Sequence, residues 1–285
     1  KKLNVNGFTI TNDLVSATIS DTTGELTSFV FKGEEMLTSP IRLDLFRAPT
    51  DNDNRDRFGS KHWYAAGLDS LTQQVKDIKV TGTGNNRVVE TTVDLINSKN
   101  VKTGTSSFIY TIKKDGTLHI GATYTPDTSV VKSLARVGIT FAMPDQFYQV
   151  SYLGRGEHET YADRKQSGRI GVYETTVPAM YHAYITPQAT GNRTDTRWVN
   201  LSDEQGRGLY INSIKPFEFS ALPYSDRVID NATHLNYLVE DGTVTVHLDA
   251  EQSGVGTATC GPATLPPYLI PIDRQQFDFT IYLVR

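Results

Sequence analysis

Apolar and polar residues alternate along much of this chain, and this pattern restricts the fold more than any other feature of the sequence. Between residues 243 and 249 the apolar side chains share one face of an extended strand, while the polar Thr245, His247 and Asp249 share the other. The same alternation is found at 277–283, and in shorter runs at 8–10, 17–19, 29–31, 108–112, 118–120 and 217–219. Such a period is typical of half-buried antiparallel strands, so the chain is predicted to be all-β.

Turn sequences separate the predicted strands, at 21–24, 114–116, 203–206 and 241–242. The Asp-Gly pairs 115–116 and 241–242 each indicate a hairpin, because glycine accepts the positive φ of a tight turn. The Gly- and Ser-rich segment 100–107 indicates a hairpin tip. The strands number about twenty, too many for one simple sandwich, so we expect an extended two-layer antiparallel sandwich. Since the sequence holds no repeat and no linker, residues 1–285 are predicted to form a single domain.

Helical sequence is scarce. Residues 62–68 are predicted to form a short helix closed by Gly67, and Ser225 is the predicted N-cap of a second one. Residues 254–268 contain too much glycine and proline for a strand, and we predict a loop that can shape a pocket. The alternative for Cys260, which lies in this loop, is a buried small apolar residue.

Charge and residue content exclude several classes of protein. The net charge is −4 and the pI about 5.9, so nothing favours binding to nucleic acid. The apolar stretches are too short for a membrane span, and 1 Cys excludes an internal disulfide framework. The 14 Tyr and 12 Phe favour strands and sugar-contacting surfaces. Because the chain begins at Lys1, we expect a fragment or a processed product, and its compartment, cytoplasm or periplasm, stays open.

The acidic run 51–56, with the sequence DNDNRD, invites comparison with calcium loops. Those loops place oxygen ligands at alternating positions, followed by a glycine and a distal glutamate. Here Arg55 occupies a ligand position and Gly59 comes too late. We therefore predict a charged turn held by bonds between side chains and backbone, and no metal site in this chain.

Glu157 and Glu159 are the candidate pair of glycosidase carboxylates. A retaining glycosidase needs two carboxyl groups about 5 Å apart on either side of the scissile bond. Residues i and i+2 of an extended segment share a face about 6–7 Å apart, yet both glutamates come from one stretch of chain. Ion pairing with Arg155, Arg164 or Lys165 is the predicted alternative role.

Three histidines, at 158, 182 and 234, are further candidates for acid or ligand roles because imidazole titrates near neutrality. None has the spacing of a zinc-ligand pair. Each is predicted to be a hydrogen-bonding group.

Segments that follow one another along the chain resemble the C-terminal domain of the large β-galactosidases of glycoside hydrolase family 2. The first is the run RAPTDND at 47–53, followed by a W-x-x-A-G element at 63–67. Residues 154–164 are similar to the family pattern G-x-G-P-x-E-N-Y-x-D-R. Residues 184–198 are similar to the family segment P-Q-E-x-G-x-R-x-D-x-R-W. Residues 219–234 and the loop 254–262 complete the set. Together these segments extend over nearly the whole chain, and they keep the family's order.

This resemblance implies a galactose mutarotase-like supersandwich and a parent enzyme that hydrolyses terminal β-D-galactosides with retention. In the family the two catalytic Glu residues, the ligands for Mg and Na and most galactose contacts lie on a (β/α)₈-barrel. No catalytic residue is therefore expected in this chain, and alone it is expected to be inactive. The expected partner is the barrel, on the same polypeptide or as a large subunit, in an oligomeric enzyme.

The resemblance also implies the contacts of this chain to the leaving group, which are Asn54, Arg55, Asp56, Cys260 and Gly261. In the family one loop at the edge of the pocket is mobile. The corresponding loop of this chain, residues 54–61, is shorter. In many members a Trp that stacks on the second sugar stands where this chain has Cys260-Gly261, whereas a subgroup reads C-G-P. Loss of that ring removes stacking worth about 1 kcal/mol.

Two other functions stay open on the sequence alone. The first is a free-standing sugar epimerase of the mutarotase type, with Glu251 as base and His182 as acid. The second is a carbohydrate-binding or assembly module without catalysis.

Overall fold

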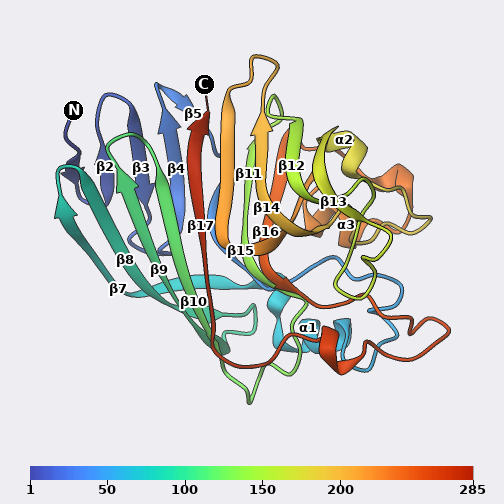
Figure 1. The fold of residues 1–285 in the computed structure, drawn as a ribbon. Coiled ribbons are helices and arrows are strands. Elements are labelled where there is room, and N and C mark those ends of the chain that lie inside the picture. Colours follow the sequence, from blue (N-terminus) through green and yellow to red (C-terminus); the bar gives the residue numbers. More distant parts are fainter. Residues whose placement is uncertain (285) are drawn as a thin grey trace.

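Strand β15 (Gly208–Leu222) joins the two halves of the molecule. In this computed structural model, which describes residues 1–284, the strands form one 17-stranded antiparallel sheet. The first part of β15 pairs with β17 (Gln275–Val284) and its last part with β16 (Thr243–Gln252). Along its other edge lies β14 (Arg193–Ser202). Two arms of the sheet therefore diverge from a single long strand (Figure 1).

The first arm continues from β17 through β10 (Leu118–Pro126), β9 (Lys102–Lys113), β8 (Asn86–Ile96) and β7 (Thr72–Thr83). The second arm continues from β16 through β11 (Arg136–Pro144), β6 (Ser39–Asp44), β4 (Leu26–Phe31), β3 (Val15–Ile19), β2 (Thr9–Thr11) and β1 (Asn4–Asn6). The short β5 (Glu34–Glu35) pairs with β4, and β12 (Gln149–Gly156) and β13 (Arg169–Thr176) extend the sheet beyond β14.

The two arms curl toward each other and bury a shared hydrophobic cluster (Figure 1). Hydrogen bonds cross between them: the Tyr110 hydroxyl on β9 donates to the Gly24 carbonyl oxygen at 3.0 Å. Beside it, Gln73 Nε2 on β7 donates to Thr23 O at 3.0 Å. Phe29 of β4 and Phe108 of β9, on opposite arms, are both fully buried. This closed two-layer arrangement confirms the expected antiparallel supersandwich.

Strand positions follow the alternation closely, since every alternating run lies within a strand or overlaps one. The Asp115-Gly116 turn closes the β9–β10 hairpin, with Gly116 at φ 91. The hairpin predicted at 241–242 is wrong, because the long connection 223–242 separates the paired strands β15 and β16. The predicted tip at 100–107 is wrong in extent: the turn ends at Val101, and β9 already begins at Lys102.

Both predicted helices are present. Helix α1 (Ser60–Ala66) ends at Gly67, which has φ 67 and donates its N–H to the last turn. In α3 (Asp226–Asn231) the Ser225 side chain accepts from Val228 N and so caps the first turn. The remaining helical segments are α2 (Val177–Met180), η1 (Leu68–Ser70), η2 (Leu235–Tyr237) and η3 (Pro266–Tyr268).

Strand β16 departs from the half-buried pattern. Residues Val244 to Asp249 are buried on both faces of the strand, including the polar side chains His247 and Asp249. The prediction of a solvent-facing polar side is wrong here, because other polar groups, among them Asp44 and Asp226, pack against that face. The consequence is a polar cluster inside the molecule, described below.

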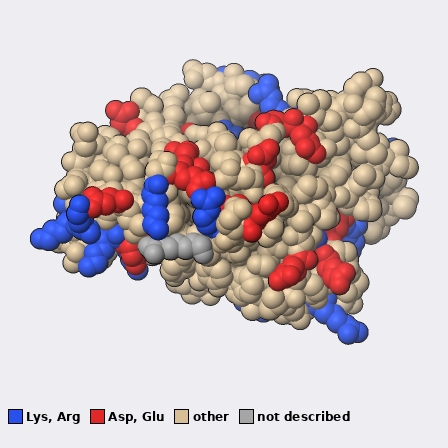
Figure 2. Space-filling view, turned by 90° about the horizontal axis from the view of Figure 1, so that it is seen from above, with Lys and Arg blue, Asp and Glu red and all other residues tan. Residues whose placement is uncertain are grey.

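Acidic and basic side chains are interspersed on the face shown in Figure 2, where the basic ones gather toward one end. In the part of the chain that the structure describes, no helix combines the length and apolar character that a membrane span requires.

Candidate active-site rim

The loop 253–264, here named the Cys260 loop, follows β16 and lies beside the segment 47–56. Figure 1 shows the end of the chain that carries this loop in red. Cys260 is exposed near its tip, which excludes the alternative of a buried apolar residue. The backbone N–H groups of Cys260 and Gly261 both donate to Thr257 O, at 3.1 and 2.7 Å. These bonds close a tight turn, so the tip is ordered by its own backbone.

Arg47, the first residue of the RAPTDND run, anchors the base of the Cys260 loop. Its guanidinium is fully buried, and it forms two hydrogen bonds to Asp53, Nε to Oδ2 at 3.0 Å and Nη2 to Oδ1 at 2.7 Å. It also donates to Ser253 O at 2.6 Å, to Gly254 O at 3.0 Å and to Gln252 Oε1 at 3.1 Å. All five N–H donors of the side chain are therefore used. The motif joins two segments that lie about two hundred residues apart in sequence.

Asp163 supports the same base from another side. Its carboxylate accepts from Val255 N at 3.0 Å and Gly256 N at 2.7 Å. A side chain at Gly254 has no room, because its Cβ would lie 2.5 Å from Asp163 Oδ2. Gly256 has φ +58, a conformation that favours glycine. The GVG sequence thus allows the backbone to wrap around a carboxylate.

Asn52 joins the two candidate loops directly. Its Nδ2 donates to Gly256 O at 2.9 Å, and its Oδ1 accepts from Thr259 N at 3.0 Å and from Thr259 Oγ1 at 2.6 Å. The segment 51–56 is the charged turn predicted from the sequence, with Asp53 accepting from Thr50 N. It lies next to the Cys260 loop.

The other residues implied for the rim occupy different positions in this turn. Asn54 and Arg55 are exposed, and Asn54 Oδ1 accepts from Ser60 Oγ at 2.8 Å. Asp56 is buried, with 5% of its surface exposed, and its carboxylate accepts from Thr264 N at 2.7 Å and Thr264 Oγ1 at 2.8 Å. Asp56 thus holds the far end of the Cys260 loop from beneath.

Glu159 is committed to structure. It pairs with Arg164 at 2.6 Å, as one of the predicted alternatives had it, and accepts from Gly191 N at 2.9 Å and from the hydroxyls of Thr190 and Tyr184. Burial would raise its pKa, but the hydrogen bonds from Tyr184 and Gly191 outweigh burial and lower the pKa. A carboxylate with all its acceptor positions used is a poor nucleophile.

The other basic residues near Glu159 have different partners. Arg155 and Lys165 both pair with Asp195, at 2.5 and 3.1 Å, so the predicted pairing of these two residues with Glu157 or Glu159 is wrong. Glu157 itself is exposed. Glu159 is thus held by several hydrogen bonds, whereas Glu157 faces solvent.

A hollow of about 760 Å³ lies beside these glutamates and is also lined by His158 and His182. His158 Nε2 hydrogen-bonds to Ser167 Oγ at 2.7 Å, and His182 packs against Tyr184 with ring centroids 4.4 Å apart. Glu251 does not line this hollow, and its pKa is raised by burial and by Asp273. The acid and base named for an epimerase therefore do not share a pocket.

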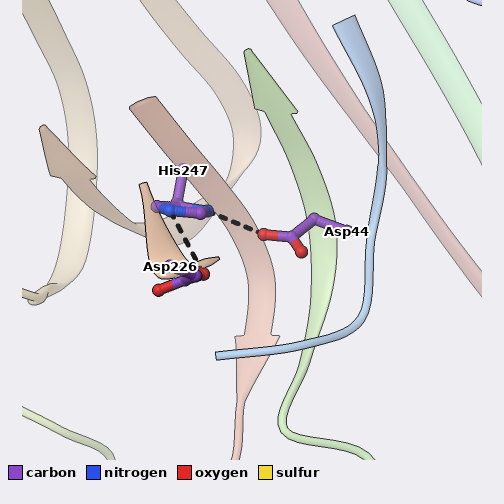
Figure 3. A group of neighbouring side chains, drawn as sticks. All are labelled: Asp44, Asp226 and His247. Carbon is purple, nitrogen blue, oxygen red and sulfur yellow. Dashed lines mark hydrogen bonds and ion pairs between the residues drawn. The ribbon is translucent and has the colours of Figure 1, made fainter. Parts of the chain in front are cut away.

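A second hollow, of about 800 Å³, is lined by Asp44 on β6, Asp226 on α3 and His247 on β16 (Figure 3). His247 lies between the carboxylates, with Nδ1 2.7 Å from Asp44 Oδ2 and Nε2 3.4 Å from Asp226 Oδ2. Arg136 Nη1 lies 3.2 Å from Asp44 Oδ2 and 3.8 Å from Asp226 Oδ2. Because a guanidinium already faces both carboxylates, we interpret the group as an ion-pair cluster instead of a metal site.

The electrostatics of this cluster follow from its burial. Burial would raise the pKa of Asp44, but Arg136 and His247 outweigh it and lower the pKa to about 2. Burial raises the pKa of the neighbouring Asp249 to about 6, and Asp44 adds to the effect while Arg136 opposes it. Arg136 and His247 therefore favour the charged form of Asp44, whereas burial favours the neutral form of Asp249.

Sequence analysis missed this cluster, as well as Asn52 and Asp163. One signal was present: His247 and Asp249 share the polar face of an alternating run. A second was Arg136, a lone charge between apolar neighbours. Neither signal identifies partners that lie far away in the sequence.

Comparison with known proteins places the chain. Residues 11–283 match the family model described as the β-galactosidase small chain. The chain is 30% identical over 271 residues to a β-galactosidase of Priestia megaterium, covering 94% of this chain and 25% of that protein. It is 31% identical over 269 residues to a β-galactosidase of Vibrio cholerae, covering 91% and 25%. The chain thus spans about a quarter of the length of these relatives.

Solved structures with the same fold are distant in sequence. A putative aldose 1-epimerase from Escherichia coli K12 superposes with a TM-score of 0.53 at 8% identity, covering 97% of this chain and 98% of that one. A GalM/aldose epimerase homologue from Caenorhabditis elegans gives 0.51 at 10% identity, covering 96% and 97%. These likenesses establish the galactose mutarotase-like fold and nothing about activity. By the family match over residues 11–283, the chain belongs to the β-galactosidase small chain family.

Proposed function

We propose that this chain is the C-terminal domain, or the separate small chain, of a retaining β-galactosidase that hydrolyses terminal β-D-galactosides. The two catalytic glutamates, and the Mg and Na ions expected for the complete enzyme, are held by a (β/α)₈-barrel outside this chain. The length of the relatives supports this division, because three quarters of each lies beyond the matched region.

The contact of Asn52 with Thr259 is the observation that carries the proposal. It joins the turn 51–56 to the Cys260 loop, the two segments that the family resemblance assigns to the edge of the catalytic pocket. Since Arg47 and Asp56 also tie these two segments together, they form one continuous rim. A rigid rim of this kind orients a leaving group without taking part in bond breaking.

Within this rim the exposed residues Asn54, Arg55, Cys260 and Gly261 contact the leaving group or the water that replaces it. Asp56 acts from beneath by holding Thr264. The reaction itself proceeds through a galactosyl-enzyme ester formed on the barrel. In this division of labour the chain governs which galactoside is accepted, and the barrel performs the chemistry.

The test is complementation. The purified chain is assayed with nitrophenyl galactoside alone and after mixing, or co-expression, with the barrel-bearing part of the same enzyme. We expect no turnover by the chain alone and turnover by the assembled enzyme. Robust hydrolysis by the isolated chain would refute the proposal, and polarimetry on α-galactose in the same preparation would detect an epimerase.

A further inference from the structure

We infer that Asn52 is the positioning residue of the Cys260 loop, and that it thereby determines which leaving group the assembled enzyme prefers. The inference rests on the proposed function, since it assigns a specificity role within the same rim. It concerns a residue outside the set that the family resemblance implied.

The two ends of the Cys260 loop are held independently of Asn52. Arg47 and Asp163 hold residues 253–256, and Asp56 holds Thr264. Between these anchors lies the tip, residues 257–263. Among the hydrogen bonds of the described residues, Asn52 supplies the only side chain from outside the loop that reaches the tip. The tip position therefore depends on one amide.

The carboxamide of Asn52 both donates a hydrogen bond to the Cys260 loop and accepts others from it. Nδ2 donates to Gly256 O, before the turn, while Oδ1 accepts from the backbone and the hydroxyl of Thr259, next to Cys260. Aspartate has the same shape but no donor, so a carboxylate oxygen would face the Gly256 carbonyl oxygen. Alanine would lose all three bonds. An amide at this position satisfies both sides of the turn at once.

Asn52 is itself fixed in place. Its carbonyl oxygen accepts from Arg55 N at 3.0 Å and Asp56 N at 2.8 Å, which closes the turn that carries it. The next residue, Asp53, is locked by the buried Arg47. On the preceding side, Asp51 Oδ2 accepts from Gln188 Nε2 at 3.2 Å. A rigid support of this kind fixes the position of the tip relative to the rest of the rim.

The test compares two substrates of the complete enzyme that share galactose and differ in leaving group: lactose and β-galactosyl fluoride, whose fluoride is too small to reach the rim. For Asn52→Ala and Asn52→Asp we expect kcat/KM for lactose to fall by roughly tenfold, a size typical of one pocket contact. The value for galactosyl fluoride and the inhibition constant of galactose should change by less than about twofold. Asn4→Ala, at an exposed position on β1, is the matched asparagine control.

A spectroscopic readout tests loop order without activity. Cys260 is the single cysteine of the 285-residue chain, so a spin label attaches there alone once any cysteines elsewhere in the complete enzyme have been replaced. We expect Asn52→Ala to increase the mobility of the label. Thr259→Val, which removes the hydroxyl bond and keeps the backbone bonds, should give an intermediate increase and serves if the Asn52 variants fold poorly.

Equal losses on both substrates, or an unchanged lactose-to-fluoride ratio with unchanged label mobility, would overturn the inference. Cys260→Trp separates this failure from failure of the proposed function. If Cys260→Trp changes the lactose-to-fluoride ratio and the Asn52 variants do not, only the positioning role is wrong. If neither changes the ratio, the loop does not border the leaving group, and both proposals fall.

Discussion

Glu218 and Asp249 face each other as directly paired residues on the neighbouring strands β15 and β16. Burial raises the pKa of Glu218 to about 8. The hydrogen bond from Asn192 lowers this pKa, while the nearby Asp249 carboxyl group raises it further. Glu218 Oε2 accepts from Asn192 Nδ2 at 2.5 Å, and Gln252 Nε2 donates to both Asn192 Oδ1 and Asp249 Oδ2. The two carboxyl groups thus belong to one hydrogen-bond network, which Gln252 Oε1 connects to Arg47 at the base of the Cys260 loop.

This pairing predicts that stability declines as the pH rises from about 4.5 to about 8. A carboxyl group whose pKa is higher in the folded state than in the unfolded chain favours folding at low pH, and its contribution is lost as pH rises through the folded value. For Glu218 the window runs from its ordinary value of 4.5 to about 8. Because the side chain is not fully enclosed, the slope should lie below about 1.4 kcal/mol per pH unit.

Urea denaturation between pH 6 and 8 measures this slope. Glu218→Gln should flatten it, since the amide keeps the acceptor for Asn192 and has no proton to lose. Glu90→Gln, in an exposed pair with Lys79, is the control and should leave the slope unchanged. If the Glu218→Gln variant keeps the wild-type slope, the pH dependence of stability arises from another titratable group.

Removing Arg47 should destabilise the fold strongly. Arg47→Met leaves the buried Asp53 carboxylate and two backbone carbonyl groups without their donor, and we expect a loss of about 3–5 kcal/mol in the free energy of unfolding. The double variant with Asp53→Asn should recover part of the loss. Lys79→Met, at the exposed pair with Glu90, should cost far less, because solvent screens that pair. Comparable effects at the two sites would contradict the anchoring role of Arg47.

Gly254→Ala tests the close approach of the loop to Asp163. The added Cβ would lie 2.5 Å from Asp163 Oδ2, so the carboxylate must move and release Val255 N and Gly256 N. We expect a loss of about 1–3 kcal/mol, as for overpacking, and faster reaction of the Cys260 thiol with a disulfide reagent. Gly121→Ala, where the nearest atom would be 3.9 Å away, should be close to neutral. A neutral Gly254→Ala would mean that the loop can shift freely.

Arg136→Met should lower the free energy of unfolding by an amount that depends on pH. Without the guanidinium, Asp44, Asp226 and Asp249 repel one another, and protonation of Asp249, whose pKa burial already raises to about 6, relieves part of the repulsion. The variant should therefore lose less stability at pH 5 than at pH 8, relative to wild type. Denaturation at both pH values measures the difference, and adding Asp249→Asn should reduce it. An equal loss at both values would contradict the assignment of Arg136 as the counter-charge.

Local sequence determined much of the fold. Alternation located the strands, Gly67 and Ser225 marked the ends of two helices, and the glycines and prolines after residue 253 excluded a strand. These features follow from the conformational preferences of neighbouring residues, which a sequence displays directly. The ordered motifs likewise indicated the family and, through it, the supersandwich.

Tertiary structure alone decided which polar groups became internal. The alternation at 243–249 separates two faces of β16 but does not reveal that Asp226 of α3 and Asp44 of β6 pack against the polar one, because those elements lie at residues 226–231 and 39–44. In the same way, Asp56 and Asn52 belong to one charged turn, yet one became buried and the other reaches Thr259. Such contacts depend on how distant segments pack. The alternation of a sequence shows only toward which face of its own strand each side chain points.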